Sequence, residues 1–104
     1  MDKIKPEILI IIKKYLSLLE NNGFPIKEAY LYGSYTRNEE NKWSDIDIAV
    51  ISDRFEGNRF LDKEKIRGLY RKVDLRISVL PLNTESLDSF FIQSEVIGKG
   101  IRVL

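Results

Sequence analysis

Hydrophobic and polar residues alternate over two short stretches of the chain. The period is two residues over 44–51 and again over 72–80. Successive side chains of a strand point to opposite faces, so this period predicts strands with one face on the core. A shorter strand is predicted over 27–32, where tyrosine and leucine are enriched. The apolar residues of the first two stretches are Ile46, Ile48 and Val50, and Val73, Leu75, Ile77 and Val79.

Three other stretches are predicted to be helical. The first runs over about 6–22 and has Gly23 beyond its end, the second lies within 52–72, and the third runs over about 85–97 before a final strand at 101–104. Strands interleaved with helices predict an α/β domain, a mixed sheet with flanking helices. The core-facing residues of the helices are predicted to be Ile4, Ile8, Ile11, Ile12, Tyr15 and Leu19, then Phe60, Ile66, Leu69 and Tyr70, then Leu87, Phe90, Phe91 and Ile97.

Length and composition limit what the chain can do. With 104 residues, 43% of them apolar, it is expected to form a single domain over 1–104. The net charge is only +1, so no attraction to a long nucleic acid is expected. There is no histidine and no cysteine, which excludes zinc sites and thiol chemistry within this chain. The apolar run at 8–12 is too short to span a membrane and no small-residue cleavage site follows it, so a cytoplasmic protein is expected.

Two carboxylates share the polar face of the strand predicted at 44–51. Asp45 and Asp47 are two residues apart, so their oxygens can converge on a hard cation such as magnesium. Two such ions can clamp the attacking and leaving oxygens of an in-line displacement. The alternative is that Ser44 and Asp45 belong to a turn and Asp47 is simply solvated.

A glycine and a serine follow the strand predicted at 27–32. Gly33 would let a phosphate approach the backbone, and Ser34 and the N–H groups of a helix start would bind its oxygens. Arg37, one turn on, could add a charge-assisted contact. The alternative is an ordinary strand-to-helix turn in which Ser34 caps the helix.

A third carboxylate lies on the polar face of the strand predicted at 72–80. If this strand pairs beside the first, Asp74 joins Asp45 and Asp47, where it could bind a metal and take the proton from an attacking hydroxyl. Otherwise Asp74 is a solvated residue paired with Arg76.

Taken together, these motifs resemble a known family. The run over 30–37, the ten residues between Ser34 and Asp45, the run over 44–48 and the later run over 73–75 are similar to the minimal nucleotidyltransferases of the DNA polymerase β superfamily. The resemblance implies that fold, with ATP as substrate and nucleotidyl transfer to a hydroxyl as the reaction. It places Gly33 and Ser34 on the triphosphate, and it places two magnesium ions on Asp45, Asp47 and Asp74.

The resemblance also implies a partner. Stand-alone members of the family often accompany a HEPN-domain toxin and neutralise it by transferring AMP to a tyrosine, so the chain is expected to be an antitoxin in a homo- or hetero-oligomer. Two alternatives stay open: a non-catalytic module that blocks a HEPN partner by contact, and an enzyme that modifies a small hydroxylated molecule. Two departures favour the first alternative, Asn38 where the family usually has glycine and Arg76 beside Asp74.

Overall fold

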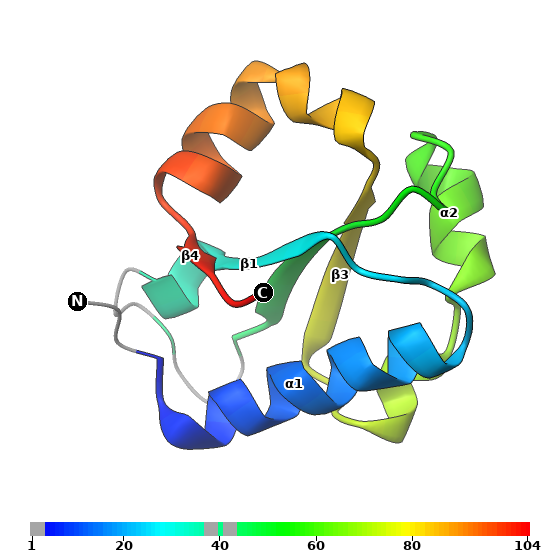
Figure 1. Cartoon of the computed structure of the whole chain (residues 1–104). Coiled ribbons are helices and arrows are strands. Elements are labelled where there is room, and N and C mark those ends of the chain that lie inside the picture. The colour runs from blue at the N-terminus through cyan, green and yellow to red at the C-terminus, as the bar shows by residue number, and fades with distance from the viewer. Residues whose placement is uncertain (1–3, 37–39, 41–43) are drawn as a thin grey trace.

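A mixed β-sheet forms the centre of the molecule. The computed structural model describes residues 4–36, 40 and 44–104. Within them, β1 (Glu28–Tyr32) pairs antiparallel with β2 (Ile46–Ile51) and β4 (Ile101–Arg102), whereas β3 (Ile77–Leu82) pairs parallel with β2. The strand order is β3-β2-β1-β4, which confirms the predicted mixed sheet and places β3 at an edge (Figure 1).

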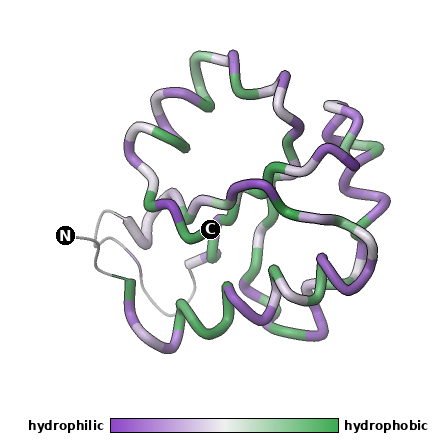
Figure 2. Tube along the Cα trace, viewed as in Figure 1, coloured by the Kyte–Doolittle hydropathy of each residue, from purple (hydrophilic) through white to green (hydrophobic). Residues whose placement is uncertain are grey.

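Helices cover both faces of this sheet. Helix α1 (Pro6–Asn21) lies on one face, and its buried stripe includes Ile12, Tyr15 and Leu19. The opposite face is covered by the 3-10 helix η3 (Thr84–Asp88) and the π-helix η4 (Ile92–Gly98). The tube in Figure 2 accordingly alternates between hydrophobic and hydrophilic residues along these helices. The periodicity therefore predicted α1 to within a residue of its observed end.

The strand predicted over 72–80 is wrong in its first half. Residues 69–72 form the short 3-10 helix η2 (Leu69–Lys72), and β3 starts only at Ile77. The Asp74 carboxylate accepts a hydrogen bond from the backbone N–H of Arg76 at 2.8 Å, which closes a turn in place of a strand. Leu75, predicted to face the core, is 76% exposed as a result.

The helix predicted over 85–97 is also wrong as a single element. Asn83 caps η3 by accepting from the Ser86 N–H at 3.0 Å, and Ser89 is extended, so the chain turns before the π-helical η4. Phe90 consequently points away from the core and is 86% exposed, and Phe91 is 45% exposed. The last strand was predicted over 101–104, but the observed strand β4 comprises only Ile101–Arg102.

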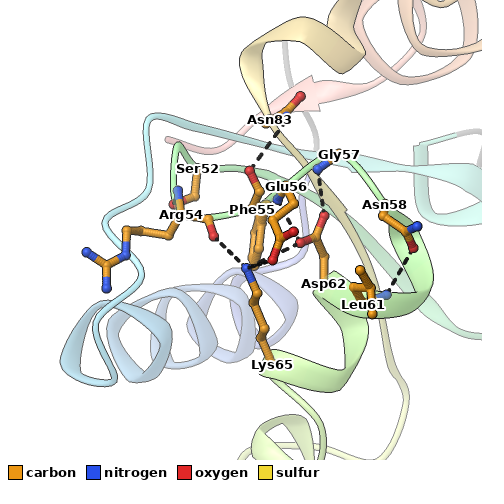
Figure 3. Close-up of polar contacts among 10 residues, drawn as sticks. All are labelled: Ser52, Arg54, Phe55, Glu56, Gly57, Asn58, Leu61, Asp62, Lys65 and Asn83. Atoms are coloured by element: carbon orange, nitrogen blue, oxygen red, sulfur yellow. Dashed lines mark hydrogen bonds and ion pairs between the residues drawn. The ribbon is translucent and has the colours of Figure 1, made fainter.

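Helix α2 (Arg59–Lys65) is a single short helix, and a buried carboxylate fixes it to the loop after β2. Asp62 is fully buried and accepts hydrogen bonds from the N–H groups of Glu56 at 2.8 Å and Gly57 at 2.9 Å (Figure 3). Lys65 closes the same loop by binding Glu56 at 2.8 Å. Ile66 is buried as predicted, but Phe60 is 73% exposed, so the prediction that it faces the core is wrong.

Within the described ranges, no helix is long and apolar enough to cross a membrane.

Candidate functional site

The register between β1 and β2 brings the two sequence motifs together. Tyr32 at the end of β1 lies opposite Asp47 of β2, so Gly33 follows directly beside the Asp47 carboxylate. Gly33 has a φ of +82°, and a Cβ built on it would collide with Asp47 Oδ2. Glycine is therefore required at 33 both for its left-handed backbone and for space. The glycine motif and the carboxylate motif form one site.

Ser34 lies in the tight turn that follows. The 3-10 turn η1 (Gly33–Thr36) is closed by Thr36, whose Oγ1 donates to the Gly33 carbonyl at 2.7 Å. This 3-10 turn begins at Gly33, where the sequence predicted the start of a helix. Arg37, predicted to bind nucleotide, lies outside the described residues.

Asp47 lies in β2, and Asp45 directly precedes that strand. Asp45 is exposed and Asp47 is half-buried. Burial raises the pKa of the neighbouring Tyr32 to about 12. The negative charge of Asp47 contributes to this increase, and the positive charge of Arg59 opposes it. Two carboxylates at one open strand end supply the oxygen ligands that magnesium prefers, so this pair fits such an ion.

Asp74 is not placed as the strand prediction required. Arg76 Nε and Nη2 each donate to one Asp74 carboxylate oxygen at 3.0 Å, a bidentate pair that lowers the pKa of Asp74. The β3 residue opposite Asp47 is Ser78. Among the described residues, no three acidic side chains lie together as a metal-binding group. The structure thus shows the pairing that the sequence offered as the alternative for Asp74.

Tyr35 also belongs to this arrangement, although the sequence did not single it out. Arg76 Nη1 also donates to the Tyr35 hydroxyl at 3.5 Å, and Tyr35 directly follows Ser34 in η1. Arg76 therefore links the Asp74 turn to the Gly33–Ser34 turn. Tyr35 and Arg76 are 41 residues apart, and no periodicity signals a contact over that separation.

The chain is similar to known proteins in sequence and in fold. A family model described as a nucleotidyltransferase domain matches residues 8–99. No curated protein sequence matches the chain.

Solved structures share the fold. A toxin–antitoxin complex with AMP-PNP contains a chain with 25% identity and a TM-score of 0.64, over 92% of this chain and 72% of that one. A complex of a tri-AMPylated Shewanella oneidensis HEPN toxin with an MNT antitoxin contains a chain with 23% identity and a TM-score of 0.61, over 93% and 71%. A toxin–antitoxin complex of MntA and HepT gives 22% identity and a TM-score of 0.59, over 91% and 70%.

Proposed function

The chain belongs to the nucleotidyltransferase domain family, and from that premise we propose that it transfers AMP from ATP to a hydroxyl acceptor. The observation that carries this proposal is the junction at which Gly33 lies against the Asp47 carboxylate. The turn proposed to bind phosphate and the carboxylate proposed to bind a cation are thereby neighbours, which supports nucleotide chemistry at this place.

In the proposed reaction each part of the site has a separate task. Gly33 and the Ser34 hydroxyl hold the triphosphate, and Asp45 and Asp47 hold magnesium. When bound, magnesium would neutralise charge on the phosphates and on the departing pyrophosphate. The acceptor oxygen bonds to the α-phosphorus as the bond from that phosphorus to pyrophosphate breaks. The hydroxyl proton passes to a carboxylate of the site and from there to water.

Asp74 remains the proposed third carboxylate of the site, although Arg76 is hydrogen-bonded to it. Both of its oxygens accept hydrogen bonds from Arg76, so Arg76 competes with a metal ion or a proton for Asp74. The Arg76 pair thus weakens Asp74 as a metal ligand and as a proton acceptor. The same pairing supports a second candidate function, a non-catalytic module that neutralises its partner by contact.

The acceptor we propose is a tyrosine of a HEPN toxin, which makes the chain an antitoxin. Support comes from the similar structures, which are toxin–antitoxin complexes, one of them with a tri-AMPylated HEPN toxin and another with AMP-PNP. Their likeness to this chain covers about nine-tenths of its length. The magnesium requirement and the cytoplasmic location belong to the same proposal.

The deciding experiment is label transfer. The chain, co-expressed with a HEPN protein from a neighbouring reading frame, is incubated with magnesium and ATP labelled at the α-phosphate. Label on the HEPN protein is expected, and Asp47→Asn should reduce it to near background because loss of a metal ligand costs several kcal/mol of transition-state stabilisation, roughly a thousandfold or more. Label that arrives only from γ-labelled ATP would indicate a kinase. Neutralisation of the toxin without any label would indicate the contact module.

A further inference from the structure

An apolar groove lies on the surface of the molecule between α1 and the end of η2. Its volume is about 560 Å³. Ile10, which contributes to its wall from α1, is 56% exposed. Clustered apolar side chains on a protein surface commonly mark a place where another molecule docks. The apolar wall of the groove comprises Ile10, Leu18 and Val73.

The rim of this groove is basic. Lys13 and Lys14 lie on α1, and Lys72 ends η2 on the other side. All three lysines are exposed, and none of them makes an ion pair with a described residue. No acidic residue is found among the described residues that line the groove. The groove therefore suits an occupant that is both apolar and acidic.

Three carboxylates on the neighbouring segments lie outside the groove. Glu7 belongs to the first turn of α1, and Glu20 lines a separate hollow together with Lys13, with which it forms no ion pair. Asp74 follows the groove residue Val73, but both of its oxygens accept hydrogen bonds from Arg76. The lysines of the rim are therefore available to the carboxylates of an occupant.

The chain carries a surface of the complementary kind on the opposite face of the sheet. Between Arg76 and Lys99 the sequence contains no basic residue. Phe90 and Phe91 lie in this interval, between η3 and η4, where both are exposed and neither packs against the core. Exposed carboxylates of η3 lie next to them in the chain. The acidic ridge, as we name this surface, comprises Glu85, Asp88, Phe90 and Phe91.

Hydrogen bonds hold the acidic ridge in shape. At the start of η3 the Asn83 side chain accepts from the Ser86 N–H at 3.0 Å. At the start of η4 the Gln93 Nε2 donates to the Leu87 carbonyl at 2.6 Å. A segment that is fixed before it binds loses less conformational entropy on docking. The turn that carries Phe90 between these two bonds is thus prepared to enter a groove.

We propose that the acidic ridge of one copy of this chain docks into the basic groove of a second copy. The phenylalanine rings are buried against the apolar wall, and the carboxylates of η3 pair with the lysines of the rim. The groove lies with α1 on one face of the sheet, and the ridge lies on the other face (Figure 1). The contact is therefore head to tail, and each bound pair keeps one free groove and one free ridge. The proposal does not depend on the transfer reaction.

The contact is expected to be weak. Two phenylalanine rings bury about 300–500 Å² on one copy, and a similar area on the groove keeps the interface below the roughly 1,200 Å² typical of stable complexes. Each exposed ion pair adds a factor of roughly two to five, and salt screens it. Association should therefore appear at high protein concentration and diminish when salt is added.

Sedimentation velocity of the whole chain over a range of concentrations tests the contact. The sedimentation coefficient of the parent should rise with concentration. A groove variant, Lys13→Glu with Lys14→Glu, should raise the dissociation constant about tenfold or more because two ion pairs are replaced by repulsion. A ridge variant, Phe90→Ser, should raise it roughly tenfold to a hundredfold through lost apolar burial.

Each variant has a matched control. Lys63→Glu with Arg67→Glu changes the net charge equally at the end of α2, away from the groove. Phe60→Ser removes another strongly exposed phenylalanine, which lies on α2. Both controls should associate as the parent does. Equal losses in a variant and its control would show that net charge or general hydrophobicity causes the association, and would overturn the docking of ridge into groove.

A mixture of the two variants tests the head-to-tail geometry. The groove variant keeps its ridge and the ridge variant keeps its groove, so the mixture should form a one-to-one dimer and nothing larger. A mixture that stays monomeric at concentrations where the parent associates would overturn the proposal. A parent that stays monomeric at every concentration would also overturn it, and would leave the groove to an acidic segment of another protein.

Discussion

At the scale of single residues, the site depends on one position that admits no side chain. Gly33 must take a left-handed backbone, and its missing Cβ leaves the space occupied by Asp47. Gly23 has a similar φ of +90°, but a Cβ there would meet nothing within 4 Å. Substitution of Gly23 therefore tests backbone strain alone, whereas substitution of Gly33 tests strain together with the collision with Asp47.

Gly33→Ala is expected to abolish label transfer and to lower stability. The left-handed backbone costs about 1–2 kcal/mol for a residue with a side chain, and the collision displaces Asp47 in addition. Gly23→Ala should lower the free energy of unfolding by a similar amount through backbone strain, and its label-transfer activity should equal that of the parent. Chemical denaturation and the label-transfer assay measure the two effects. Equal activity in both variants would show that Asp47 can move aside without consequence.

Ser34→Ala is expected to weaken transfer without removing the metals. A hydrogen bond to a charged group is worth about 1.5–3 kcal/mol, or roughly tenfold to a hundredfold in transfer efficiency. Steady-state kinetics with varied ATP measures the loss. Kinetics indistinguishable from the parent would assign Ser34 to the turn alone.

Tyr15→Phe should stabilise the protein. The ring of Tyr15 on α1 is fully buried, its hydroxyl has no hydrogen-bond partner in the described residues, and burial raises its pKa. Removing a buried, unsatisfied hydroxyl should gain about 1–3 kcal/mol. The control is Tyr30→Phe, which loses a 2.6 Å hydrogen bond to Glu28 and should cost about 0.5–1.5 kcal/mol. A loss of stability in Tyr15→Phe would mean that its hydroxyl is satisfied, for example by a buried water.

At the scale of elements, the sequence predicted those parts whose structure follows from periodicity. Helix α1 and the strand around Ile46 and Ile48 have regular apolar faces, and both are where the pattern placed them. The errors lie where a polar side chain binds nearby backbone, as Asp74 does before β3 and Asn83 does at η3. Such local hydrogen bonds end a strand or helix while leaving the hydrophobic period intact.

Asp62→Asn should loosen α2. The carboxylate binds two backbone N–H groups, and an amide in its place would direct an NH₂ group at one of them. The expected cost is about 1–3 kcal/mol, measured by denaturant titration. Asp53→Asn, which breaks an exposed pair with Lys27, should cost less than about 1 kcal/mol. Equal costs would show that the buried bonds contribute no more than a surface pair.

At the scale of the whole molecule, the sheet determines which distant residues meet. The sequence predicted that Gly33, Ser34, Asp45 and Asp47 form one site, and the β1–β2 register brings the two motifs into contact. Their catalytic roles remain predictions. The Arg76–Tyr35 contact was beyond prediction, because it joins two turns that are 41 residues apart in the sequence.

Magnesium should stabilise the folded protein through the same site. A ligand at a hundred times its Kd adds about 2.7 kcal/mol to folding, so Tm should rise when magnesium replaces EDTA. Asp45→Asn should melt at the same temperature as the parent or higher in EDTA, since like charges repel, and should respond less to magnesium. A lower Tm for Asp45→Asn in EDTA, with no magnesium effect on either protein, would assign Asp45 a structural role.

The proline in β3 lies where the edge strand is covered. Arg76 and Leu82 direct their carbonyls to Ile46 and Ser52 on the β2 side, so the backbone nitrogen of the alternate residue Pro81 points away from β2. Pro81 is fully buried, so other parts of the chain cover this end of the edge. Proline has no N–H, and no donor is therefore left without a partner beneath that cover. Pro81→Val should bury an additional N–H and lower the free energy of unfolding by about 1–3 kcal/mol, measured by denaturant titration.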